Sequence, residues 1–590
     1  MENSTKIKEL YDLATESQKN KDSENAIKNY KKILKINPGH FEVLFNLSLI
    51  LSKSKKYKNA IELLKKATKI KPDNANCYNN LGNIYKDQNK LKEAKLNYNK
   101  AIKIEPGHAN AHYNLGSIFY KLNDLEKAIE YYQIASNLDP MHFNALFGLG
   151  LIFNKKKEIE KSINFFNRVL KIQPKDFRSY NNLGLIYEKI GNLKQAKNCY
   201  EKVLSIAPQH SAAHNNLGNI YVAEGQNEKA IEHYKKALQV APQDFNIIHH
   251  LSLLDPDAVD TNLKNVVKEN LIKKNISSRN KCYGNFLLSK YENNAKNYKK
   301  EFTYLTLAHK HFIEAEIKNL TPINYWLRDL PKTNFSGKLK CQINSENFNP
   351  IFIFGLPRSG STLVEKIIAS SSEKILIGEE TGIINFYLKE KILKNKNIDF
   401  NDQKIQEDII TRYKYKNLIN DDSSTFTDKS LENFFFLDII KIIFPNAKMI
   451  NCDRNPFASL MSIFKNNLVN LSWAHDINNI LKYFDNYFKK INYFKKIYPN
   501  LIYNINYEKL VSHPEIETKK LLNFCGLQWS EKCLDFYKRK DLISKTTSNI
   551  QIRSPIYKSS INKYEPYMKF FLKFIDVFFL IRKKFSLELG

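Results

Sequence analysis

Proline recurs at a fixed interval of 34 residues through the first 242 positions of this 590-residue chain. The series comprises Pro38, Pro72, Pro106, Pro140, Pro174, Pro208 and Pro242. A fixed period of about 20 to 50 residues is typical of chains in which one supersecondary unit is built repeatedly and stacked on its neighbours. The spacing therefore predicts a repeat array over the N-terminal part of the chain.

Other positions keep the same register. In most repeats a leucine is followed by a glycine and, three residues later, by an aromatic residue, as in Leu81, Gly82 and Tyr85. Small residues let two helices approach closely, and we expect this aromatic side chain to fill the gap. The pattern resembles the tetratricopeptide repeat in period and signature positions. It predicts seven helical repeats over residues 5–242 and an all-α solenoid domain over residues 5–256.

A second column places asparagine directly before the leucine. Its members are Asn46, Asn80, Asn114, Asn182 and Asn216. Packing does not require them, and this face of the first helix lines the concave side of such a solenoid, where amides can bind the backbone of an extended peptide. The column resembles the asparagine ladder of the O-GlcNAc transferase repeats, which grips substrate peptides. It predicts an extended protein or peptide substrate in the groove. The alternative is that asparagine is simply common in this chain.

The C-terminal half opens on a glycine-rich turn. An apolar run, Ile351–Phe354, leads into Gly355-Leu-Pro-Arg-Ser-Gly-Ser-Thr362, and an apolar helical stretch follows. This strand–loop–helix order aims backbone N–H groups at a phosphate. The glycine spacing is that of a nucleotide P-loop, but Ser361 and Thr362 stand where lysine and serine or threonine are expected. The turn therefore predicts a phosphate site that lacks the lysine of a magnesium–triphosphate site.

Short apolar runs alternate with helical stretches from residue 350 onward. The strand candidates are Ile351–Phe354, Ile375–Ile377, Thr425–Thr427, Ala447–Cys452 and Leu501–Asn506. Such alternation predicts an α/β domain with a parallel sheet, helices on both faces and ligands at the carboxyl ends of the strands. We assign residues 346–590 to this domain and residues 257–345, which are charged and helical in pattern, to a connector.

Six stretches of the α/β region resemble the sulfotransferases, most closely the tyrosylprotein sulfotransferases, and occur in the same order. They are Leu356–Thr362, Gly378–Thr381, Asp428–Lys429, Phe444–Lys448 with Arg454 and Ser462, Tyr507–Pro514, and Thr547–Pro555 with Lys563. The resemblance covers roughly residues 350–565. It implies a P-loop-like domain that transfers a sulfuryl group from 3′-phosphoadenosine 5′-phosphosulfate (PAPS) to a hydroxyl group. A sulfuryl group carries less charge than a phosphoryl group, so no metal is required.

The resemblance also implies residue roles. Glu380 matches the base that takes the proton of the acceptor hydroxyl, with Glu379 as its competitor. Lys429 would reach the bridging oxygen of the donor, and Arg358 would act beside it on the phosphate. The residues implied to bind the donor are Arg358, Ser359, Gly360, Ser361, Thr362, Arg454, Ser462, Tyr507, Ser548, Arg553 and Lys563, with Arg454 and Ser462 on its 3′-phosphate.

Composition limits the binding partners, cellular locations and metal sites that we expect for this chain. The net charge of +31 comes from lysine spread over the whole chain, which favours anionic nucleotides and acidic substrates over specific nucleic-acid binding. No 18-residue uncharged apolar run occurs, so we predict no transmembrane segment. Seven scattered cysteines without a C-x-x-C pair predict reduced thiols and a cytoplasmic location. The thirteen histidines show no metal-ligand spacing, so we predict no metal site.

These observations favour a protein-tyrosine sulfotransferase whose repeats recruit the polypeptide. The animal tyrosylprotein enzymes are membrane-anchored whereas this chain shows no anchor, so a small-molecule or glycan acceptor stays open, as does a homodimer. Two other classes are weighed. An ATP-using kinase or NTPase conflicts with the missing P-loop lysine. A repeat scaffold with an inactive nucleotide-binding domain conflicts with the retained charged residues of the motifs.

Overall fold

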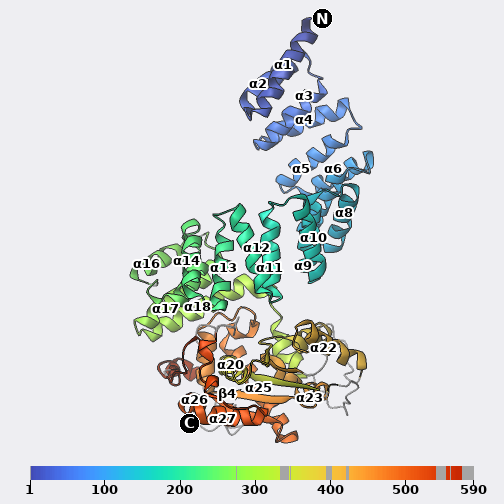
Figure 1. Ribbon diagram of the computed structural model, residues 1–590. Helices are drawn as coiled ribbons and strands as arrows, with labels where there is room; N and C mark the ends of the chain where they lie inside the picture. Colours follow the sequence, from blue (N-terminus) through green and yellow to red (C-terminus); the bar gives the residue numbers. More distant parts are fainter. Residues whose placement is uncertain are drawn as a thin grey trace. The chain divides into compact units, whose positions relative to one another are not determined.

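The computed structural model describes residues 2–258, 260–273, 275–332, 345, 347–393, 402–419, 424–539, 553–558 and 560–574. The chain forms two compact units, Met1–Pro208 and Gln209–Gly590. The first unit contains helices α1 to α12, and the second contains the remaining helices and the sheet (Figure 1).

The first unit is a stack of helix pairs in which each helix packs against the next along the chain (Figure 1). The helices are α1 (Glu2–Lys19), α2 (Ser23–Ile36), α3 (Phe41–Lys53), α4 (Tyr57–Ile70), α5 (Ala75–Asp87), α6 (Leu91–Ile104), α7 (Ala109–Lys121), α8 (Leu125–Leu138), α9 (Phe143–Lys155), α10 (Ile159–Ile172), α11 (Phe177–Lys189) and α12 (Leu193–Ile206). The predicted solenoid is confirmed. Each proline of the series lies just beyond the end of a second helix, because proline cannot continue a helix.

The glycine column allows a close approach between the two helices of a repeat. A Cβ atom on Gly82 would lie 2.4 Å from the ring of Tyr98, and one on Gly116 would lie 2.6 Å from the ring of Tyr132. The expectation that the aromatic residue three positions after the glycine fills this gap is wrong. A fully buried ring of the second helix fills it, whereas Tyr85 lies partly buried against two neighbouring hydrophobic clusters.

The second unit begins with a seventh helix pair and continues with further helices. They are α13 (Ser211–Glu224), α14 (Asn227–Val240), α15 (Phe245–Leu254), α16 (Thr261–Leu271), α17 (Ser278–Asn294), α18 (Tyr298–Glu316), a helical turn at Tyr325–Asp329 and α19 (Leu330–Lys332). Helices α17 and α18 pack along each other and share a hydrophobic core with one face of the sheet. Within the described residues, every helix is too short or too polar to span a bilayer.

The sheet has five parallel strands in the order β2-β3-β1-β4-β5. The strands are β1 (Phe348–Gly355), β2 (Leu376–Ile377), β3 (Ser424–Asp428), β4 (Lys448–Asp453) and β5 (Ile502–Asn506). Each overlaps a predicted strand, so the α/β prediction is confirmed. The other helices of this domain are α20 (Ser361–Ala369), α21 (Ile383–Leu393), α22 (Gln403–Tyr415), α23 (Leu437–Ile443), α24 (Pro456–Phe464), α25 (Ile477–Ile497), α26 (Tyr507–Ser512), α27 (Pro514–Cys525) and the 3₁₀ segment Glu565–Phe574.

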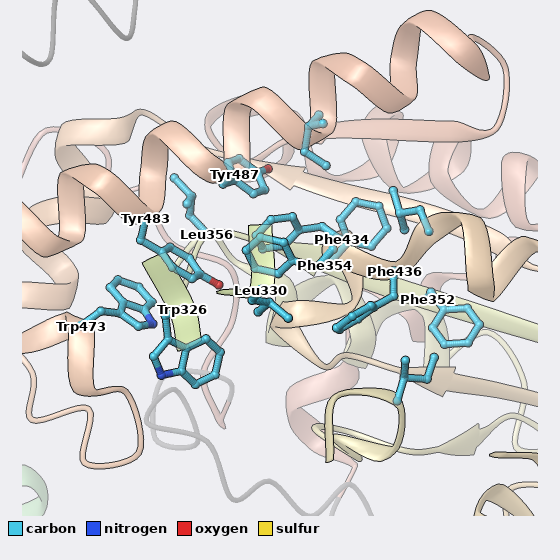
Figure 2. Packing of buried hydrophobic residues seen from close by; sticks show 14 of the residues in the cluster. Trp326, Leu330, Phe352, Phe354, Leu356, Phe434, Phe436, Trp473, Tyr483 and Tyr487 are labelled. Atoms are coloured by element: carbon cyan, nitrogen blue, oxygen red, sulfur yellow. The ribbon is translucent and has the colours of Figure 1, made fainter. Parts of the chain in front are cut away.

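Alternate residues of β1 are buried on opposite faces of the sheet. Ile351 and Ile353 belong to a core that includes residues of α20 and α27. Phe352 and Phe354 belong to the larger core, which includes residues of α25 (Figure 2). In that core the rings of Trp473 and Tyr483 stack at a centroid distance of 3.8 Å. Burial on both faces explains why the strand reads as a continuous apolar run.

Candidate functional site

Four predicted motifs follow directly on four strands. The glycine-rich turn follows β1, Lys429 follows β3, Arg454 follows β4, and Tyr507 follows β5. All strands are parallel, so these residues meet at the carboxyl edge of the sheet, where open α/β sheets bind their ligands. The topology thereby brings together positions that lie up to about 150 residues apart in the sequence.

The turn after β1 needs its second glycine. Gly360 has a φ of +96°, and a Cβ atom there would lie 2.5 Å from Cδ2 of Tyr507. Helix α20 begins at the next residue, so its first N–H groups lie at the turn. The side chains of Ser359, Ser361 and Thr362 are buried beside it, and Oγ of Ser359 finds no hydrogen-bond partner in the described part of the chain. The turn therefore forms a polar cradle at a helix N-terminus.

Two guanidinium groups lie together next to this turn. Arg358 Nε donates to Oγ of Ser462 on α24 at 3.1 Å, and Arg454 Nη1 donates to the carbonyl of Arg358 at 2.8 Å. The Arg454 guanidinium lies over the ring of Tyr507, 4.4 Å from its centroid. Burial, and then the charge of Arg454, lower the pKa of Arg358 to about 10. Arg358 therefore stays charged at neutral pH, and the two guanidinium groups form a pair suited to binding an anion.

Two residues that the sequence analysis missed complete this cluster. The carbonyl of Ser560 accepts from Arg454 Nη2 at 3.0 Å, and its hydroxyl lies 2.7 Å from the hydroxyl of Tyr507. The hydroxyl of Tyr564 accepts from Nδ2 of Asn455 at 3.1 Å. Neither residue belongs to a recognisable motif, so no sequence signal marked them.

The other C-terminal residues that were predicted to bind the sulfuryl donor do not all lie in this cluster. Lys563 is exposed. Burial lowers the pKa of Lys465, Glu301 partly restores it, and the charge of Lys563 lowers it a little further. Arg553 is bonded to the helical repeats. Its Nη2 donates to the carbonyl of Ala223 on α13 at 3.2 Å. Ser548 lies outside the described residues.

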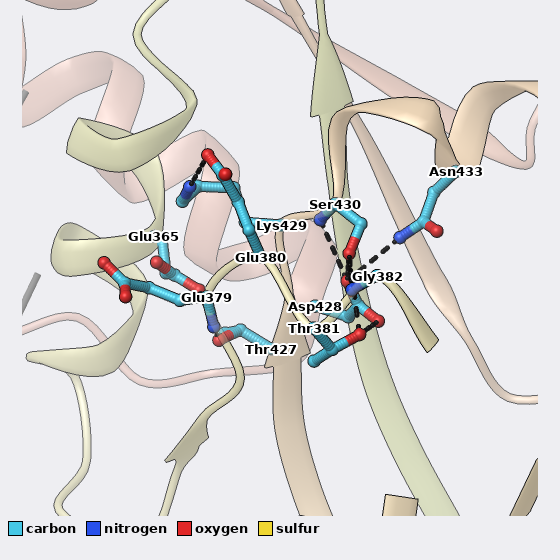
Figure 3. Close-up of polar contacts among 10 residues, drawn as sticks. All are labelled: Glu365, Glu379, Glu380, Thr381, Gly382, Thr427, Asp428, Lys429, Ser430 and Asn433. Carbon is cyan, nitrogen blue, oxygen red and sulfur yellow. Dashed lines mark hydrogen bonds and ion pairs between the residues drawn. The ribbon is translucent and has the colours of Figure 1, made fainter. Parts of the chain in front are cut away.

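A buried lysine and an exposed glutamate form the second part of the site (Figure 3). Lys429 Nζ lies 3.1 Å from Oε1 of Glu380, and the two side chains are 1% and 53% exposed. Burial opposes the charge of Lys429, but the carboxylates of Glu380, Glu365 and Glu379 outweigh it, so the pKa of Lys429 lies above its usual value. Lys429 is therefore a fixed cation, and Glu380 links it to solvent.

Asp428 holds this part of the site in shape (Figure 3). Its Oδ2 accepts from the hydroxyls of Thr381 and Tyr413, both at 2.6 Å. Its Oδ1 accepts from the backbone N–H and hydroxyl of Ser430, at 2.9 and 2.6 Å, and from Asn433 Nδ2 at 3.1 Å. A fully buried carboxylate with five donors fixes the Gly378–Thr381 turn against the residues that follow β3.

Glu379 and Glu380 differ in their surroundings. Glu379 has a φ of +51°, its N–H donates to Oε1 of Glu365 at 3.1 Å, and its carbonyl accepts from the N–H of Lys429 at 2.6 Å. The backbone of Glu379 thus connects Lys429 to Glu365, whose pKa is raised by burial. Glu432, which the sequence analysis missed, lies near the carboxylates of Glu380 and Asp428, and burial raises its pKa to about 7.

The predicted asparagine column lies on the first helices of the repeats, but its amides are partly engaged within the solenoid. Asn114 is buried, donates to Asn79 Oδ1 at 3.0 Å and accepts from Lys86 Nζ at 3.0 Å. Asn46, Asn182 and Asn216 also have intramolecular partners, which are Tyr11, Arg178 and Asn215. Asn80 is half-buried. A bound peptide would have to replace the bonds of Asn114.

No group of three or more histidine, cysteine, aspartate or glutamate side chains is placed to hold a metal ion in the part of the chain that the structure describes. The six described cysteines are free and buried.

Comparison with known proteins finds family-model matches in both halves of the chain. A family model described as "Sulfotransferase family" matches residues 350–531. Tetratricopeptide-repeat models match residues 10–40, 49–89, 82–123, 109–142, 150–191 and 176–243.

Two curated relatives are distant. An uncharacterized protein of Aquifex aeolicus is 26% identical over 362 residues, which is 56% of this chain and 46% of the relative, so the match spans about half of its length. A putative protein-tyrosine sulfotransferase of Caenorhabditis briggsae is 22% identical over 231 residues, covering 36% of this chain and 80% of the relative. Among solved structures, a tetratricopeptide repeat protein of Parabacteroides merdae is 20% identical over 42% of this chain and 99% of its own, with a TM-score of 0.34.

Proposed function

We propose that this chain transfers a sulfuryl group from PAPS to a hydroxyl group. It carries a match to the sulfotransferase family at residues 350–531, which follow an array of tetratricopeptide repeats in the sequence. The observation that carries the proposal is the meeting of a phosphate cradle, a guanidinium pair and the Lys429–Glu380 pair at one edge of the sheet. The missing P-loop lysine favours this reaction over magnesium–ATP chemistry.

The residues at the sheet edge fit such a donor. Among the described residues, Oγ of Ser359 and Nε of Arg454 are buried and have no hydrogen-bond partner, and a buried polar atom of this kind is costly unless a ligand satisfies it. The cradle at Ser359–Thr362 would hold the 5′-phosphosulfate. Arg454 and Ser462 would hold the 3′-phosphate, with Arg358 beside them. When bound, PAPS supplies the sulfuryl group and a phosphate leaving group.

The chain's own residues then have distinct tasks. Lys429 keeps its charge because of the surrounding carboxylates, so its ammonium group would stabilise the negative charge that develops on the leaving phosphate. Glu380 would accept the proton of the acceptor hydroxyl as this oxygen takes the sulfuryl group and the phosphate leaves. Its exposed side chain can meet an acceptor that arrives from solvent. The direct contact with Lys429 supports Glu380 over Glu379 in this role.

We further propose tyrosine of a protein or peptide as the acceptor. The name of the worm relative supports this choice, and a tetratricopeptide solenoid is a surface for polypeptides. The repeats would recruit the substrate, with the asparagine column contributing where its amides are accessible. A small-molecule or glycan acceptor is the alternative outcome of the test.

The test is transfer of labelled sulfate from PAPS to lysate proteins and to a tyrosine peptide library, without added metal. Glu380→Ala is compared with Glu373→Ala, a change at an exposed glutamate seven residues earlier. We expect label on tyrosine that is lost only in Glu380→Ala. Asn80→Ala should then reduce labelling of long substrates more than of short ones.

Three other outcomes count against parts of the proposal. Tight binding of 3′-phosphoadenosine 5′-phosphate (PAP) without labelled polypeptide would exclude the protein acceptor and favour small molecules or glycans. PAP binding without transfer to any hydroxyl acceptor would indicate an inactive domain on a repeat scaffold. Stabilisation by magnesium–ATP but not by PAP would refute the sulfotransferase assignment.

A further inference from the structure

A segment near the C-terminus crosses the guanidinium cluster. We call the described residues 553–558 and 560–567 the C-terminal strap. Within it, Ser560 contacts Arg454 and Tyr507, and Tyr564 contacts Asn455 at the start of α24. The strap therefore touches the residues that follow β4 and β5, where the 3′-phosphate of the donor would lie.

The first end of the strap is attached to the last repeat. Arg553 Nη2 donates to the carbonyl of Ala223, in the last turn of α13. The helix ends at Gly225 with a φ of +77°, and a Cβ atom there would lie 3.0 Å from Nε of Arg553. A cation at a helix C-terminus interacts favourably with the terminal carbonyl groups.

The second end of the strap is attached to the helices α17 and α18. The hydroxyl of Tyr567 donates to Oε2 of Glu301 on α18 at 2.5 Å, and Nδ2 of Asn293 on α17 donates to the same oxygen at 2.9 Å. Lys465 Nζ lies 3.0 Å from Oε1 of Glu301 and donates to the Tyr567 hydroxyl at 2.6 Å. The carboxylate of Glu301 is thus surrounded by three donors although its residue is only 2% exposed.

Lys465 extends this network to the donor site. It caps α24 directly after Phe464, three residues beyond Ser462, whose hydroxyl accepts from Arg358, so the network reaches the end of the helix that carries Ser462. Removing one partner of a buried charged network leaves the others unsatisfied, so Lys465 and Tyr567 would both move if Glu301 lost its charge.

We propose that Glu301 is a positioning residue of the donor site, which fixes Lys465 and the C-terminal strap beside Arg454 and Ser462. Donor binding is thereby coupled to the helix pair α17–α18, which lies outside the 350–531 region of the sulfotransferase model. The ligand in this inference rests on the proposed function, whereas the network rests on the contacts above. The coupling is reciprocal, so donor binding must also stabilise the attachment of the strap to α18.

The test measures the dissociation constant of PAP by calorimetry on the full chain. Glu301→Gln and Tyr567→Phe keep the shape of the side chain and remove the charge or the hydroxyl. We expect each to raise the dissociation constant by about 3- to 10-fold, the usual size of such indirect coupling. Glu314→Gln, at an exposed position of the same helix, should leave it unchanged.

A second readout separates positioning from general stability. In the wild type, PAP should slow amide hydrogen exchange in α18 and in residues 560–574, and Tyr567→Phe should abolish the effect in α18 while the sheet stays protected. If Glu301→Gln does not fold, Tyr567→Phe decides. Wild-type PAP affinity in folded variants would overturn the inference. Failure of the wild type itself to bind PAP would instead refute the proposed function, and the donor site of this inference with it.

Discussion

Replacing Gly360 by alanine should damage the donor site more than its small size suggests. Gly360 is the residue before α20 and has φ +96° and ψ 9°. A Cβ atom there would lie 2.5 Å from Cδ2 and 3.1 Å from Cε2 of Tyr507. The substitution therefore strains the backbone and also displaces the Tyr507 ring.

The size of the effect follows from these contacts. A left-handed conformation costs a residue with a Cβ atom about 1–2 kcal/mol. Displacement of Tyr507 loses its hydrogen bond to Ser560, worth about 1 kcal/mol, and its contact with the Arg454 guanidinium, worth about 0.5–1 kcal/mol. We expect Gly360→Ala to lower the free energy of unfolding by about 3 kcal/mol.

Gly526→Ala is the matched control. Gly526 ends α27 with a φ of +69°, and among the described residues beyond its own turn no atom lies within 4 Å of the Cβ that alanine would add. Gly526→Ala therefore adds only the backbone strain of a left-handed conformation, about 1–2 kcal/mol. In thermal melts, where 1 kcal/mol corresponds to about 2–4 °C in a domain of this kind, Gly360→Ala should fall well below Gly526→Ala. In calorimetry only Gly360→Ala should bind PAP more weakly, by about tenfold or more, because only it moves the Tyr507–Arg454 pair.

Equal melting temperatures for the two variants would refute the contact argument, since they differ only in what the added methyl group meets. Unchanged PAP affinity in a destabilised Gly360→Ala would show that Tyr507 and Arg454 do not shape the donor site.

Three further predictions concern single groups. Lys429→Met should lower turnover by about 10²–10³-fold with a smaller change in PAP affinity, because the lysine ammonium group acts on charge that develops during transfer. An equal loss of turnover and of PAP affinity would contradict that role. Asp428→Asn leaves buried donors without an acceptor and should destabilise the protein by about 1–3 kcal/mol, measured by urea unfolding; unchanged unfolding would refute the shaping role of this carboxylate. Burial lowers the pKa of His309 to about 4 and that of His475 to about 3, whereas the unfolded value is near 6.5, so the unfolded chain binds more protons between these values. Their contribution to stability is therefore complete above about pH 6.5 and is lost as the pH falls towards 4. The melting temperature should fall from pH 7 to 6 to 5, and it should fall less in His475→Gln. An equal fall in the wild type and in His475→Gln would contradict the role of these histidines.

Much of the site could be placed from the sequence because its residues sit at the ends of strands. Lys429, Arg454 and Tyr507 each follow a short apolar run, and the alternation of strands and helices predicts a parallel sheet whose carboxyl ends meet. The choice between Glu379 and Glu380 could not be made in this way. It depends on a left-handed backbone at Glu379, which turns the two neighbouring side chains in different directions.

The sequence by itself determined the repeat register, the seven helix pairs, the five strands and the glycine-rich turn after β1, because these follow from periodicity and turn residues over a few neighbours. Only the tertiary structure showed which buried rings, such as that of Tyr98, pack against the glycines. It also showed the attachment of Arg553 to α13 and the network around Glu301. Glu301 and Tyr567 are 266 residues apart, and no local pattern marks either. Such pairs form only where packing has brought two distant segments together. Their chemistry therefore depends on contacts that cannot be read from either segment alone.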